Sequence, residues 1–88
     1  MKYQKLLDKL KDILSAKRQA QLEKYSSLKK VLKSLRAESK RLEEEMAGDI
    51  DDEARREITS KLKVISKQRK KGLKVLQELK DERDTEHQ

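Results

Sequence analysis

The chain has 88 residues and a formal net charge of +7, and 47% of its residues are charged while only 33% are hydrophobic. These values allow one thin domain and exclude a large globular core. The absence of cysteine excludes a disulfide framework and thiolate metal sites. No apolar run approaches the length of a membrane span, so we expect a cytoplasmic protein without membrane contacts.

Two structural classes suit such a composition, a disordered chain and an elongated helical one. The apolar residues recur at regular intervals, and the chain contains no proline and only two glycines, so little in it interrupts a helix. The sequence therefore predicts an all-α protein, organised as a single domain over residues 1–88.

A row of leucines at seven-residue spacing dominates residues 2–46, which we expect to form one helix. The row consists of Leu7, Leu14, Leu28, Leu35 and Leu42, with Gln21 in the remaining slot. A seven-residue apolar repeat keeps one stripe of a helix against a partner helix, as in a coiled coil. This helix must therefore lie against another helix.

A turn is expected at residues 47–51, after which a second helix runs over 52–83 and a frayed tail over 84–88. Gly48 is typical of the position just past a helix end, and the aspartates that follow favour a new helix start. The alternative is one uninterrupted helix. At about 100° per residue, that helix would place Leu42 and Leu62 on opposite faces, which favours the turn. A short connection makes the helices antiparallel, so the sequence predicts a long helical hairpin of the coiled-coil type.

The hairpin alignment leaves the first ten or so residues without a partner helix in their own chain. This overhang and two leucines off the predicted seam suggest a surface for self-association, comprising Tyr3, Leu6, Leu7, Leu10, Leu22 and Leu73. A lone hairpin buries little apolar surface, so we expect a homodimer that forms a four-helix bundle. The sequence leaves open whether the two copies pair through their faces or exchange helices.

Basic residues form two outward stripes at helical spacing. Lys29, Lys33, Arg36 and Lys40 make the first, and Lys63, Lys67, Lys70 and Lys74 make the second. Two such stripes side by side are able to bind a polyphosphate backbone. The simpler alternative is that both are ordinary solvated faces. The lack of acidic residues interspersed in each stripe keeps the polyanion hypothesis in consideration.

Other chemistry finds little support. His87, near the end of the chain, is the only histidine, and the acidic stretch 43–53 lacks the ordered ligand positions of a calcium loop. An elongated hairpin offers no pocket to perturb catalytic carboxylates. We therefore expect no catalytic residue, metal, cofactor or small-molecule substrate.

Two functional hypotheses remain. The first is a non-enzymatic structural or adaptor protein that self-associates and contacts a protein partner. The alternative is a dimeric binder of RNA or DNA that uses the two basic stripes.

Overall fold

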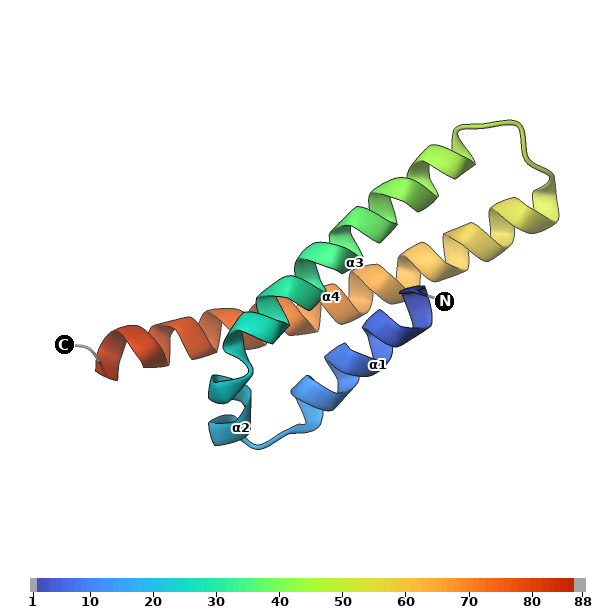
Figure 1. Cartoon of the computed structure of the whole chain (residues 1–88). Helices are drawn as coiled ribbons and strands as arrows, with labels where there is room; N and C mark the ends of the chain where they lie inside the picture. The colour runs from blue at the N-terminus through green and yellow to red at the C-terminus, as the bar shows by residue number, and fades with distance from the viewer. Residues whose placement is uncertain (1, 87–88) are drawn as a thin grey trace.

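The computed structural model describes residues 2–86, and their secondary structure is entirely helical (Figure 1). The four helices are α1 (Lys2–Ser15), α2 (Arg18–Glu23), α3 (Tyr25–Met46) and α4 (Asp52–Glu86). The protein is all-α, as the composition and periodicity predict. None of these helices has both the length and the apolar character needed to cross a membrane.

Residues 47–51 connect α3 to α4, and polar side chains secure both helix ends. Asp51 Oδ1 accepts a hydrogen bond of 2.8 Å from the Ala54 amide, which caps the start of α4. The guanidinium of Arg55 donates to the carbonyl of Met46 over 3.2 Å and so caps the end of α3. At each of these two helix ends, a local side chain therefore satisfies one of the free backbone groups.

The end of α4 differs from the expected frayed tail. The helix continues to Glu86, so residues 84–86 are helical, three beyond the predicted end at residue 83. His87 and the last residue of the expected tail lie outside the described residues.

The expected single helix over residues 2–46 is divided into α1, α2 and α3. Lys17, between α1 and α2, has an extended backbone with φ −66° and ψ 156°. Lys24, between α2 and α3, departs less strongly from helical geometry, with φ −97° and ψ 17°. The chain reverses at the first break, and α1 runs back alongside α3 and α4 (Figure 1). The chain breaks here, rather than forming the expected single helix, because the break lets α1 bury its apolar face.

The core is the volume where α1 lies against α3 and α4. Leu10, Leu28, Leu35, Ile65 and Leu79 are completely buried there. Gly72 of α4 marks the closest approach: a Cβ atom on it would lie 2.7 Å from Leu32 Cδ2 and 3.1 Å from Leu10 Cδ1. The weakly apolar part of α4 around Gly72 is thus the place where α1 packs.

Two tyrosines with cations over their rings border this core. The Arg83 guanidinium lies 4.3 Å and the Lys29 Nζ 5.7 Å from the ring centroid of Tyr25. Lys61 Nζ lies 5.8 Å from the ring centroid of Tyr3. These contacts join α3 to the C-terminal end of α4 and α1 to the middle of α4.

Candidate interaction surface

An open groove of about 580 Å³ lies between α3 and α4. We call it the basic groove, and it is lined by Ser26, Lys29, Lys30, Leu32, Lys33, Arg36, Arg69, Leu73 and Leu76. Five of these residues are cationic and none is acidic, while three leucines supply an apolar floor. Leu73 is 44% exposed and, with Val64, is one of two exposed large hydrophobic residues in the described part of the chain.

Helical periodicity explains why these side chains share one groove. On α3, Lys29, Lys33 and Arg36 recur at i, i+4 and i+7, and on α4 Arg69, Leu73 and Leu76 do the same. No α1 residue lines the groove. Two other clefts, between α1 and α3, are lined on α3 by residues that include Ser27, Val31, Ser34 and Glu38. The basic groove therefore lies on the side of the α3–α4 pair that α1 leaves uncovered.

Arg69 is held across the groove floor. Its Nε donates a hydrogen bond of 3.3 Å to the backbone carbonyl of Leu32, and its side chain is half-buried. Its other guanidinium donors have no protein acceptor within the described part of the chain. A guanidinium fixed through one nitrogen presents the remaining N–H groups to a carboxylate or phosphate in a defined orientation.

The charge of the groove is not neutralised locally. Among residues 3–84, no carboxylate forms an ion pair with Lys29, Lys30, Lys33, Arg36 or Arg69. Arg18 and Arg41 form ion pairs in the described part of the chain, and neither lines the groove. The surface is therefore a leucine floor inside a rim of positive charge.

The eight residues of the two predicted basic stripes are all exposed, but they do not form one surface. Lys29, Lys33 and Arg36 line the basic groove, whereas Lys40 does not. On α4, Lys67, Lys70 and Lys74 line no part of the groove, and Lys63 lines a neighbouring cleft. About 100° per residue places this second stripe on the outer face of α4, away from Gly72 and the core.

The predicted self-association residues are also distributed differently from expectation. Leu7 and Leu10 are buried in their own chain, with 5% and 0% exposure, and Tyr3 and Leu6 pack against the same core. Leu22 is half-buried, and only Leu73 remains largely exposed. The apolar overhang therefore does not exist in the folded chain, because α1, which contains it, packs its apolar face against α3 and α4.

Sequence reasoning missed Lys30 and Arg69 as groove residues. Lys30 lies outside the i, i+4, i+7 pattern that selects the stripe of α3, and Arg69 falls within the weak part of the predicted seam. Arg69 could have been recognised from the sequence as a cation on the core-facing side of a helix. A cation in that position needs a hydrogen-bond acceptor, which here is the Leu32 carbonyl.

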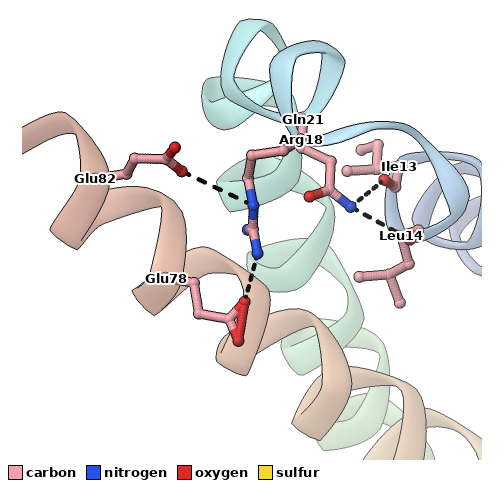
Figure 2. A network of polar contacts seen from close by, with 6 residues as sticks. All are labelled: Ile13, Leu14, Arg18, Gln21, Glu78 and Glu82. Atoms are coloured by element: carbon pink, nitrogen blue, oxygen red, sulfur yellow. Dashed lines mark hydrogen bonds and ion pairs between the residues drawn. The ribbon is translucent and has the colours of Figure 1, made fainter.

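A polar cluster holds the reversal between α1 and α2 (Figure 2). Gln21 is buried, and its Nε2 donates to the carbonyls of Ile13 over 3.0 Å and Leu14 over 3.2 Å. Arg18 forms an ion pair of 2.9 Å with Glu78 and a longer one of 3.8 Å with Glu82. The residue that interrupts the leucine row is thus the one that caps the end of α1.

Glu38 is the second buried polar side chain, with 7% exposure. It accepts hydrogen bonds from the guanidinium of Arg41, one turn further along α3. The hydrogen bond and the charge of Glu38 raise the pKa of Arg41 above its ordinary value. The Arg41 guanidinium therefore provides hydrogen bonds and an opposite charge for the buried Glu38 carboxylate, which explains how α3 tolerates this carboxylate beside the α1–α3 interface.

No protein family, curated protein or solved structure matches this chain.

Proposed function

We propose that the protein is a non-enzymatic adaptor that acts through protein–protein contacts, and that the basic groove binds an acidic amphipathic helix of a partner. The observation that supports this proposal is the exposed Leu73 within a rim of five unpaired cations. An amphipathic helix is recognised when its apolar side chains enter a groove and its flanking charges meet opposite charges on the rim.

The leucine floor and the cationic rim make different contributions. Burial of the exposed part of Leu73 contributes on the order of 1–2 kcal/mol, and the adjoining leucines extend the apolar contact. The rim supplies selectivity for carboxylates and a faster encounter, both of which weaken as salt rises. A partner helix with apolar residues at i, i+3 and i+7 and glutamates on either side fits both features.

The outer stripe of α4 supports a second candidate function, binding to RNA or DNA. Lys63, Lys67, Lys70 and Lys74 are exposed and make no ion pair within the described residues. Within the described residues the only aromatic rings are those of Tyr3 and Tyr25, and each already has a cation over it, so bases find few rings on which to stack. We therefore place it second.

Peptide binding distinguishes the two functions. A fluorescent helical peptide with the leucine and glutamate pattern described above should bind the protein, and a scrambled peptide of equal charge should bind at least about tenfold more weakly. The charge reversal Arg36→Glu, in the groove, should abolish binding. The matched reversal Lys67→Glu, on the outer face of α4, should leave it unchanged.

The opposite pattern would refute the adaptor proposal. If the peptide fails to bind, or if Lys67→Glu weakens it as much as Arg36→Glu, the groove is not the binding surface. Binding of duplex RNA or DNA that is lost in Lys67→Glu, with a steep dependence on salt, would favour the second function.

We also propose that the protein self-associates as a homodimer, in keeping with the four-helix bundle expected from the sequence. The support is the sequence spacing of the leucine row, which keeps its seven-residue interval across the residues where the two breaks occur. Sedimentation at increasing protein concentration tests this. A mass that stays monomeric at every concentration would contradict it.

A further inference from the structure

The segment that joins α1 to α3 contains no residue that forbids a helix. Residues 16–24 include neither glycine nor proline, and Ala16, Ala20, Leu22 and Glu23 are good helix formers. Lys17 has an extended backbone, and its φ of −66° already suits a helix. Rotation of its ψ from 156° to the helical value near −42°, with a smaller change at Lys24 from φ −97° and ψ 17°, would join α1, α2 and α3 in one helix.

The contacts between α1 and α3 are symmetric about Gln21. Leu10 and Leu32 both approach Gly72, Ile13 and Val31 line one cleft, and Leu6 and Glu38 line another. This antiparallel register pairs the heptad positions of Leu7 with Leu35 and of Leu14 with Leu28, and it leaves Gln21 at the centre. The leucine row therefore matches itself when it is reversed about Gln21.

We propose that two copies of this chain exchange α1, so that a continuous helix over residues 2–46 of each copy packs antiparallel to that of the other. Each α1 then makes with its partner's α3 and α4 the contacts it makes within its own chain. The two Gln21 side chains meet on the dyad, where a polar residue in an apolar row defines the register. This inference rests on the proposed self-association and specifies how it occurs.

The C-terminal end of α4 in each copy lies close to the centre of such a dimer. Arg18 contacts Glu78 and Glu82, and Tyr25 contacts Arg83, so both ends of the segment 18–25 lie near the C-terminal turns of α4. Two copies of each segment around the dyad make four helices side by side. The basic groove lies on the other side of the α3–α4 pair and remains open in both copies.

The balance between the two forms depends on a few contacts. The folded-back monomer keeps the hydrogen bonds from Gln21 to the carbonyls of Ile13 and Leu14. The exchanged dimer satisfies those carbonyls within a continuous helix. Its formation, however, costs the translational and rotational entropy that two separate chains lose when they associate. Exchange therefore rises with protein concentration and with any change that removes the Gln21 cap.

Disulfide trapping tests the exchange directly, since the chain has no cysteine of its own. Lys9 and Lys30 line one cleft, so cysteines at these positions are close when α1 packs on α3. A Lys9→Cys protein mixed with a Lys30→Cys protein at high concentration, in a glutathione redox buffer, should give the mixed disulfide dimer. Lys9→Cys mixed with Lys70→Cys, on the outer face of α4, is the matched control and should not.

Two further variants shift the balance in opposite directions. Gln21→Leu completes the leucine row and removes the cap, and it should lower the dimer dissociation constant by at least about tenfold. Gln19→Leu, exposed on the same helix, is its control and should change that constant less than about twofold. Lys17→Pro fits the observed φ and interrupts a continuous helix, so it should leave a folded monomer.

The results separate exchange from self-association in general. A dimer whose Lys9→Cys and Lys30→Cys copies do not cross-link, or which persists in Lys17→Pro, would show self-association without exchange and overturn this inference. A monomer at every concentration, also in Gln21→Leu, would overturn both proposals.

Discussion

Gly72 shows at the scale of one residue how the three long helices meet. A side chain there would collide with Leu32 Cδ2 at 2.7 Å, and Leu10 Cδ1 lies only 3.1 Å away. Glycine in a helix interior costs about 1 kcal/mol of helix propensity relative to alanine. That cost is offset by the close approach of α1, because the glycine leaves the space that two buried leucines fill.

The first prediction concerns a branched side chain at this position. Gly72→Val should lower the free energy of unfolding by about 2 kcal/mol or more, because its methyl groups require space that Leu32 and Leu10 occupy. Lys71→Val changes the neighbouring exposed residue and controls for the helix propensity of valine. Urea denaturation compares the two variants, and equal losses would show that α1 does not pack closely at Gly72.

The second prediction concerns Tyr3, whose pKa burial raises above 10.0. In a Tyr25→Phe background Tyr3 is the only tyrosine. Its ultraviolet titration should then have a midpoint above 10.0 in the native protein and return to about 10 in denaturant. Because the folded pKa is the higher one, the stabilisation is complete below about pH 10 and is lost as pH rises through the folded pKa. A native midpoint at or below the denatured one would place Tyr3 in water, with α1 undocked.

At the scale of the elements, the C-terminal end of α3 and the start of α4 could be predicted, and the break after α1 could not. Asp51 caps the start of α4, and Gly48 disfavours a continuous helix by its low helix propensity, although its φ is not positive. Ser15, Ala16 and Lys17 carry no such signal, and the leucine row continues through them. The break results from tertiary packing of α1 against α3 and α4, which overrides local helix preference.

The third prediction compares the two interactions that hold this break. Gln21→Ala leaves the carbonyls of Ile13 and Leu14 without their donor and should cost about 1–3 kcal/mol of stability. Arg18→Ala removes an ion pair whose side chains are 45% and 42% exposed, and it should cost at most about 1 kcal/mol. Urea denaturation at low protein concentration measures both. A larger loss for Arg18→Ala would show that surface charge, rather than the buried cap, maintains the reversal.

At the scale of the whole molecule, the protein is a rod of 54 × 20 × 16 Å with one covered and one open side. Three of the five cations of the candidate surface could be predicted, because helical spacing selects Lys29, Lys33 and Arg36 from sequence alone. The rest depends on which helix faces α1 covers. Sequence spacing places the stripe of α4 correctly on an outward face, but it does not show that this face points away from the groove.

The measurement that tests the account most directly is the distance between Lys9 and Lys30 within one chain. Spin labels at both positions, in doubly labelled protein diluted at low concentration with excess unlabelled protein, report this distance by pulsed electron resonance. Both residues line the same cleft in the folded-back chain, so we predict a distance far below that of a continuous helix. At a total protein concentration where the chain is monomeric, a single population near 32 Å, about 1.5 Å for each residue between them, would show an unbroken helix and contradict the account.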